Sequence, residues 1–281
     1  MNGVNTIEPK GGSMTSAWRW AIGGAVAAAL ALSAGPAPAQ SGPVKMEWLS
    51  WSIFRFTSPS GKIIVTNPFV TNPDSPVKVP DFPKVDVIVV ADGHGDEVGS
   101  THEIAIQTGA KIITPFEMWS TYFQPRNVPE AQMHRSNPGD WYRFDGITVR
   151  NVGAVHGSGT PDKLYGGPAM GFMLQFENGL TVYFAGSTAL TMDMQLWGML
   201  YKPDVAILPL SNNRDPQDIV HMVRLLRTEN PNLKTIIPHH HRVQPPQGAP
   251  TPAMMEAALK ASGLPVTVLN PDLKKVYDLT K

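Results

Sequence analysis

The stretch VDVIVVADGHGDEVG, residues 85–99, decides how the rest of the chain is interpreted. Its first half is a continuous apolar run, which is typical of a strand buried on both faces of a sheet. We expect a helix over residues 97–108, and the run AKIITP at residues 110–115 has the character of a second strand. A strand, a helix and another strand in this order predict a βαβ unit with parallel strands.

Other segments predict strands on both sides of this unit. Residues 45–69 alternate apolar and polar side chains around a turn at residues 59–61, as a hairpin does. Strand character also marks three later segments, at residues 143–155, 171–186 and 204–210. Within the second of these, Asn178-Gly179 is a strong two-residue hairpin turn.

The end of the chain predicts two more helices. Asp215 is the expected N-cap of the first, Pro216 occupies its first position, and an apolar stripe follows at helical spacing. A last helix, at residues 253–262, lies between strands at residues 234–238 and 265–270. Hairpins followed by βα units predict an α/β fold in which two mixed β-sheets pack together and helices cover their outer faces.

Composition excludes several classes of partner. Lys plus Arg and Asp plus Glu number 23 each, so the charge balance predicts no binding of nucleic acid. The chain has no cysteine and therefore no disulfides, and any metal ion must be held by histidines and carboxylates. We expect the partner to be a small-molecule substrate; the sequence does not predict an oligomeric state.

Residues 1–39 have the pattern of a secretory signal peptide. Basic residues precede an apolar run at residues 21–34, and the small residues of APA precede Gln40. The run is shorter than the roughly 20 residues that a membrane span needs, and an uncleaved anchor is the alternative. We expect cleavage before Gln40, a single domain at residues 40–281, a periplasmic or secreted protein, and no membrane association after cleavage.

The loop after the buried strand carries residue types that bind metals. Asp92, His94 and Asp96 alternate, so their side chains point the same way in an extended segment, and the glycines between them let the backbone bend around an ion. One alternative is that Asp96 caps the helix that begins near Glu97. Another is a calcium loop with Glu103 as its last ligand, but His94 and Glu97 stand at unsuitable positions and a strand precedes the loop.

Histidines elsewhere add to this loop. His94, His156 and one of residues 239–241 follow the ends of predicted strands, so they can reach a common edge of the sheets. The other histidines are expected on helices or in a polar loop: His102 and His221 on helices, His134 in the loop. The sequence therefore predicts a metal site assembled from distant segments.

The order of these motifs resembles the metallo-β-lactamase fold superfamily, and within it the L-ascorbate-6-phosphate lactonase-like group of metal-dependent hydrolases. The resemblance covers nearly all of the chain after residue 39, from IIVTNPF at residues 63–69 to TIIPHHHR at residues 235–242. It implies an αββα sandwich of two mixed sheets.

The metal-binding residues of the superfamily are the motif His-x-His-x-Asp-His and three residues further along the chain. Several of these residues are altered in this sequence. These positions fall on Asp92, His94, Asp96, Glu97, His156, Ser187 and His240. The resemblance implies that positions 92, 94 and 156 bind one ion and positions 96, 97 and 240 another. Asp92 and Glu97 replace histidines, and Ser187 replaces a bridging aspartate. Asn67 replaces the Asp of Asp-Pro-Phe, and LSWS at residues 49–52 stands where Gly-His-Ser is usual.

These replacements change the expected metal chemistry. Carboxylates at positions 92 and 97 are still ligands, so we expect one or two divalent ions, Zn²⁺, Mn²⁺ or Fe²⁺. Ser187 is a poor substitute for a bridging carboxylate, so one ion should bind better than the other. Asp96, which can orient water, and His240 are the catalytic candidates, and the weaker candidates for the site are Ser187, His239 and His241.

The functional expectation is an exported metal-dependent hydrolase that acts on a small ester, lactone or phosphoester by attack of a metal-bound hydroxide. The alternative is a periplasmic protein that has lost hydrolysis and binds a metal or another ligand. A calcium-stabilised structural module is a third, weaker interpretation.

Overall fold

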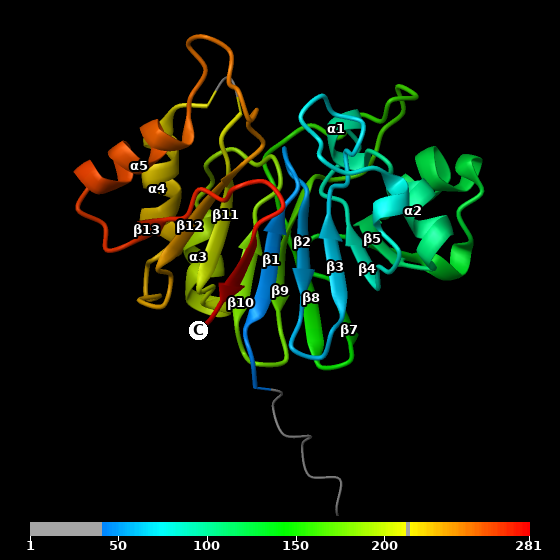
Figure 1. Cartoon of the computed structure of the whole chain (residues 1–281), viewed down its shortest axis with the longest axis horizontal. Helices are drawn as coiled ribbons and strands as arrows, with labels where there is room; N and C mark the ends of the chain where they lie inside the picture. Colours follow the sequence, from blue (N-terminus) through cyan, green and yellow to red (C-terminus); the bar gives the residue numbers. More distant parts are fainter. Residues whose placement is uncertain (1–40, 212–213) are drawn as a thin grey trace, which may run out of the picture. The chain divides into compact units, whose positions relative to one another are not determined.

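Two mixed β-sheets of seven strands each lie face to face in the computed structural model (Figure 1). The structure describes residues 41–211 and 214–281, so the expected signal peptide at residues 1–39 lies outside the described residues. Among the helices described, none has the length and apolar character of a membrane span.

The first sheet combines strands from both ends of the described chain. Its order is β14 (Val276–Leu279), β1 (Val44–Trp48), β2 (Phe54–Thr57), β3 (Ile63–Thr66), β4 (Val87–Val89), β5 (Lys111–Pro115) and β6 (Met133–Ser136). Pairing is antiparallel from β14 to β3 and parallel from β3 to β6. The hairpin and the βαβ unit predicted from residues 45–115 are therefore confirmed.

The second sheet has the same mixed character. Its order is β13 (Thr267–Val268), β12 (Thr235–His239), β11 (Val205–Pro209), β10 (Thr181–Phe184), β9 (Met170–Gln175), β8 (Ile147–Gly153) and β7 (Trp141–Phe144). The strands from β13 to β10 are parallel, and those from β10 to β7 are antiparallel. The predicted turn joins β9 to β10: Gly179 has φ +84°, and Asn178 accepts a hydrogen bond from the Leu180 amide.

Helices cover the outer faces of both sheets (Figure 1). Their bounds are α1 (Gly95–Val98), α2 (Thr101–Thr108), α3 (Asp193–Tyr201), α4 (Pro216–Leu226) and α5 (Pro252–Ala261). Four further helical segments are η1 (Val79–Asp81), η2 (Trp119–Phe123), η3 (Gln124–Arg126) and η4 (Glu130–Gln132). At the start of α4, Asp215 accepts a hydrogen bond from the Gln217 amide, which confirms the predicted N-cap.

Buried apolar side chains form three clusters, one in each of the three interfaces between the four layers of helices and sheets. The inner cluster joins the two sheets and includes Phe54, Phe56, Phe172 and Phe184. The second lies under α2 on the first sheet, and the third lies under α3, α4 and α5 on the second sheet. Burial of apolar surface in all three interfaces stabilises the predicted αββα sandwich, which is confirmed.

Two local expectations, and the alternative that Asp96 is a helix cap, were wrong. The helix expected over residues 97–108 is two helices, because the chain turns at Gly99, which has φ +41° and no room for a Cβ beside the backbone of Pro68. Asp96 is not a cap: α1 begins after His94, and Asp96 lies in its first turn. His134 lies in β6, paired with Ile113 of β5, rather than in a loop.

Candidate metal centre

Loops that follow the ends of strands bring the candidate residues together at one edge of the sheets. Asn67 and Asp92 follow β3 and β4 of the first sheet, while His156, Ser187 and His240 follow β8, β10 and β12 of the second. Such strand ends are where α/β folds place ligands, because the strands are rigid and the loops are free to vary.

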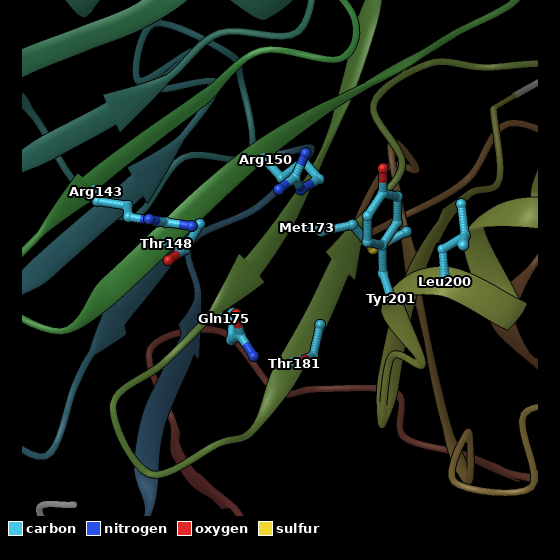
Figure 2. Close-up of a pocket in the computed structure, with 8 residues that line it drawn as sticks. All are labelled: Arg143, Thr148, Arg150, Met173, Gln175, Thr181, Leu200 and Tyr201. Carbon is cyan, nitrogen blue, oxygen red and sulfur yellow. The ribbon is translucent and has the colours of Figure 1, made fainter. Parts of the chain in front are cut away.

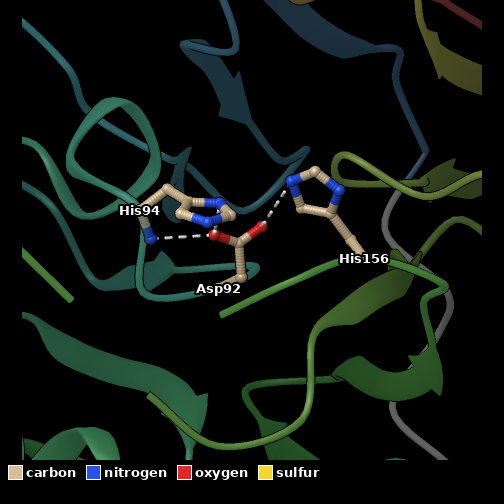
Figure 3. Close-up of side chains that lie close together, drawn as sticks. All are labelled: Asp92, His94 and His156. Carbon is tan, nitrogen blue, oxygen red and sulfur yellow. Dashed lines mark hydrogen bonds and ion pairs between the residues drawn. The ribbon is translucent and has the colours of Figure 1, made fainter. Parts of the chain in front are cut away.

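The nitrogen-rich half of the centre consists of Asp92, His94 and His156 (Figure 3). Each offers one ligand atom, and these atoms lie within 4.8 Å of one another. Asp92 Oδ1 is 3.0 Å from His94 Nδ1, and Asp92 Oδ2 is 4.0 Å from His156 Nε2. The Asp92 carboxylate is buried, whereas the two imidazoles are 39% and 32% exposed, so the group opens to solvent on the imidazole side.

Close packing of two loops holds this half together. The amide of Gly93 donates a hydrogen bond of 3.1 Å to Ser158 Oγ in the loop that also carries His156. A Cβ at position 93 would lie only 3.2 Å from the backbone of Gly159 and Thr160. Glycine at this position therefore lets the two loops approach closely enough for their ligands to meet.

The nitrogen-rich half has the chemistry of a divalent metal site. Asp92 Oδ2 is buried and has no hydrogen-bond partner among the described residues, which is costly for a carboxylate unless a cation lies beside it. The hydrogen bond to Asp92 raises the pKa of His94, and burial lowers the pKa of His156. Two imidazoles and one carboxylate form a common set of ligands for Zn²⁺ and Fe²⁺.

The oxygen-rich half consists of Asp96, Glu97 and His240. Asp96 Oδ2 and Glu97 Oε1 lie 3.3 and 3.4 Å from His240 Nε2. These spacings are those of a close ion pair; among the described residues, the group whose ligand atoms all lie close enough together to hold an ion is that of Asp92, His94 and His156. The donor set, two carboxylates and one imidazole, contains more oxygen than that of the nitrogen-rich half.

Glu97 is held by two further side chains. Ser187 Oγ donates a hydrogen bond of 2.6 Å to Glu97 Oε1, and Asn67 Nδ2 donates to Glu97 Oε2. The Glu97 side chain is 1% exposed, so these donors replace solvent entirely. Ser187 therefore contacts the oxygen-rich half through Glu97, in place of the bridging carboxylate that the resemblance implies.

Burial and close pairing shift the pKa values of this half. Burial, aided by Asp92, raises the pKa of Glu97 to about 7 against the opposing contacts with His240 and Ser187. Burial also disfavours the charged form of His240, but Asp96 and Glu97 outweigh it and raise its pKa to about 10. For Asp96, burial is outweighed by the hydrogen bond with His240, so its pKa lies below the usual range.

His240 is the member of the triplet that faces the carboxylates. In the part of the chain that the structure describes, neither His239 nor His241 pairs with a carboxylate. His239 Nδ1 lies 3.2 Å from Ser52 Oγ in the core, and the His241 ring packs on Trp48 at 5.0 Å. Burial lowers the pKa of both rings. Both rings therefore pack against neighbouring side chains and do not face the carboxylates.

Trp51 positions His240, and its role was missed in the sequence. The His240 amide donates to the Trp51 carbonyl at 3.1 Å, and the two rings lie 5.2 Å apart. Trp51 and Ser50 both have positive φ, at +52° and +81°, so LSWS forms a tight turn beneath the imidazole. Asn67 was likewise recognised only as a departure from a motif. The signal in the sequence was that Trp51 and Asn67 lie in two segments, LSWS and TNPF, that depart from the motifs of the family.

A separate cavity of about 270 Å³ contains none of these residues (Figure 2). It is lined on the outer face of the second sheet by Arg143, Thr148, Arg150, Met173, Gln175, Thr181, Leu200 and Tyr201. Thr181 begins β10, whereas Ser187 follows the other end of that strand. The cavity therefore lies toward the opposite end of the sheet from the candidate metal centre.

Residues 57–241 match the family model of the β-lactamase superfamily domain, a stretch that includes both halves of the centre. The chain belongs to the metallo-β-lactamase superfamily. The superfamily and fold predicted from the sequence are thus confirmed.

Relatives within the superfamily are metal-dependent hydrolases. A UPF0173 metal-dependent hydrolase of Rubrobacter xylanophilus is 34% identical over 211 residues, which cover 73% of this chain and 84% of the relative. Another, from Cupriavidus taiwanensis, is 31% identical over 266 residues, covering 86% and 91% of the two chains. The structure of Igni18, a metallo hydrolase of the archaeon Ignicoccus hospitalis, matches with a TM-score of 0.71 at 26% identity, over 85% of this chain and 99% of that one.

Proposed function

We propose that this member of the superfamily is a metal-dependent hydrolase that acts on a small ester, lactone or phosphoester. The observation that carries the proposal is the convergence of Asp92, His94 and His156 around a buried carboxylate oxygen that has no hydrogen-bond donor among the described residues. The names of the relatives, metal-dependent hydrolases, agree with it.

The residues of the centre divide the work of hydrolysis. A divalent ion, Zn²⁺, Mn²⁺ or Fe²⁺, would supply acidification of water and polarisation of the scissile bond. Asp96 is 32% exposed and its pKa is held low by His240, so it is ionised and accessible to orient a water molecule. His240, charged and fixed between two carboxylates, is placed to donate to a leaving group or an oxyanion.

A combined metal and activity assay tests this function. Purified protein should contain a divalent ion, and metal-free protein reloaded with Zn²⁺, Mn²⁺ or Fe²⁺ should hydrolyse members of a panel of lactones, esters and phosphodiesters. His94→Ala should lose both the ion and the activity, while His102→Ala, on α2, should keep both. Absence of turnover with every metal across the panel would refute the proposal that the protein is an enzyme.

Ser187 favours one alternative, a metal- or ligand-binding protein without hydrolytic activity. Its hydroxyl donates to Glu97 and does not supply a carboxylate shared by two ions. This alternative predicts stoichiometric metal that depends on His94, together with no turnover in the same panel. The same experiment therefore distinguishes this alternative from the proposed hydrolase.

We propose in addition that the protein is exported to the periplasm or secreted, with Gln40 as its first mature residue. The support is the pattern of basic residues, apolar run and small residues in the first 39 positions. Amino-terminal sequencing of the protein from its native compartment should begin at Gln40. An intact amino terminus on a membrane-bound chain would contradict the proposal.

A further inference from the structure

We propose that the cavity on the outer face of the second sheet binds a small organic anion, with Arg143 and Arg150 holding a carboxylate or phosphate group and an apolar wall covering the rest (Figure 2). The cavity has a volume of about 270 Å³ and shares no residue with the candidate metal centre. This second site requires neither a metal ion nor hydrolysis at the centre.

The pairing of four antiparallel strands places polar side chains of the cavity in one row. Arg143 on β7 lies opposite Thr148 on β8, and Thr148 lies opposite Gln175 on β9. Gln175 in turn lies opposite Thr181 on β10. Side chains paired in this way are about 5 Å apart at their Cβ atoms, so the four residues form a continuous polar surface.

The second arginine lies diagonally across from the first. Arg150 on β8 is opposite Trp141, which is two residues before Arg143 on β7. Val149 belongs to the inner cluster, so its neighbours Thr148 and Arg150 face outward. Diagonal positions of this kind are about 7–8 Å apart, a separation that long side chains span. The two guanidinium groups are therefore close enough to bind one anion together.

Both arginines lie against aromatic rings and have no carboxylate partner among the described residues. Arg143 Cζ is 4.1 Å from the centre of the Trp141 ring, and Arg150 Cζ is 5.3 Å from the centre of the Tyr201 ring. None of the residues that line the cavity is acidic. A guanidinium group that stacks by its face keeps the N–H groups at its edge for an acceptor.

Two other arginines that lie over aromatic rings do have a carboxylate. Arg126 is 3.7 Å from the centre of the Tyr122 ring and bonds Asp162 at 2.7 Å. Arg135 lies near two rings and bonds Glu130 at 2.8 Å. Compared with these two sites, the cavity lacks only the acid. A bound carboxylate or phosphate would supply it and would match the fork of each guanidinium group.

The apolar wall indicates what the anionic group is attached to. Leu200 and Tyr201, at the end of α3, form one side of the cavity, and Met173 lies beside Arg150 in the sheet. Leu200 is 68% exposed, so covering it with the apolar part of a ligand is favourable. Sites for drug-sized ligands measure about 300–1,000 Å³, so we expect a smaller molecule, an aryl or alkyl carboxylate or phosphate monoester.

The test measures binding of benzoate and phenylphosphonate to the purified protein by ligand-observed NMR titration at low ionic strength. Phenylphosphonate stands for a phosphate monoester and is not hydrolysed. At least one of the two should bind, more tightly than inorganic phosphate or the neutral benzyl alcohol. The tighter of the two probes identifies the anionic group as carboxylate or phosphate.

Variants locate the bound anion. Arg143→Gln and Arg150→Gln should each weaken binding about 10- to 100-fold, because each removes hydrogen bonds to a charged group. Arg126→Gln is the matched control: it removes the same charge from an aromatic ring where Asp162 already pairs, and should leave the affinity unchanged. Leu200→Glu, at an exposed helix position, supplies a carboxylate beside the arginines and should abolish binding.

His94→Ala separates this site from the candidate metal centre and should leave anion binding unchanged. Failure of both anions to bind, or affinity that is unchanged in Arg143→Gln and Arg150→Gln, overturns the inference. Binding that is lost in His94→Ala and kept in the arginine variants places the anion at the centre and also overturns it. Equal affinity for inorganic phosphate and phenylphosphonate, with no binding of benzoate, excludes the apolar wall. Each of these results leaves the proposed hydrolase standing.

Discussion

Gly99→Ala should destabilise the protein strongly, because it disturbs the contact on which the oxygen-rich half is built. Gly99 has φ +41°, and a Cβ there would overlap the Pro68 carbonyl oxygen and the backbone of Phe69. The neighbouring Ser100 amide donates to the same Pro68 carbonyl at 2.9 Å, so the loop cannot withdraw without losing this bond. Because Asn67 precedes Pro68, a shift of this loop would also move the donor to Glu97.

The magnitude follows from separate contributions. Positive φ at a residue with a Cβ costs roughly 1–2 kcal/mol, and forcing backbone apart in a packed region costs roughly 1–3 kcal/mol. The lower entropy of the unfolded alanine chain offsets about 0.4–1 kcal/mol of this. We therefore expect Gly99→Ala to lower the free energy of unfolding by about 1–5 kcal/mol.

Gly109→Ala is the matched control. Gly109 has φ +78°, and a Cβ there would meet nothing within 4 Å, so only the backbone strain applies. We expect it to cost about 1 kcal/mol or less. Urea unfolding measures both variants as shifts in midpoint at constant slope. If Gly99→Ala lowers the free energy of unfolding no more than Gly109→Ala does, the close approach of Gly99 to Pro68 does not exclude a side chain, and the reasoning is refuted.

Three further predictions concern the centre. A divalent ion at about 100 times its Kd should add about 2.7 kcal/mol to the stability measured by calorimetry; His94→Ala should abolish this gain, and His102→Ala should retain it. His240 has a folded pKa of about 10 against an ordinary value of 6.5, so the stability from its charge is present below pH 6.5 and lost as pH rises through 10. The metal-free protein should therefore lose at most about 1.4 kcal/mol per unit between pH 7 and 10, and an equal slope in His240→Gln would contradict this. Ser52→Ala removes the partner of buried His239 and should cost about 1–3 kcal/mol in urea unfolding, without loss of metal.

The features that sequence predicted correctly depend on residues close together in the chain. Asp215 caps α4 by bonding an amide two residues away, and Asn178-Gly179 closes a turn between neighbouring strands. Apolar runs predicted β4 and β5 because strands buried on both faces tolerate few polar side chains. From these local rules the order of elements follows, and the order is sufficient to predict the layers.

The features that sequence missed depend on contacts between distant segments. The break between α1 and α2 arises from the loop at Pro68, which no helical pattern around Gly99 reveals. Adjacent histidines cannot be distinguished by their spacing, and it is the positive φ of His240, +60°, and its bond to the Trp51 carbonyl that turn this ring toward the carboxylates. The candidate residues could be named from the sequence, but the contacts that hold them in place could not.

The altered residues around Glu97 are best understood as one linked change in polarity. With aspartates at positions 67 and 187, Glu97 would share a buried space with two more carboxylates, and a buried unpaired charge costs several kcal/mol. With Asn67 and Ser187, both of its oxygens meet donors instead. A hydrogen-bond donor at position 187, in place of a third carboxylate, is therefore what the buried carboxylate at position 97 requires.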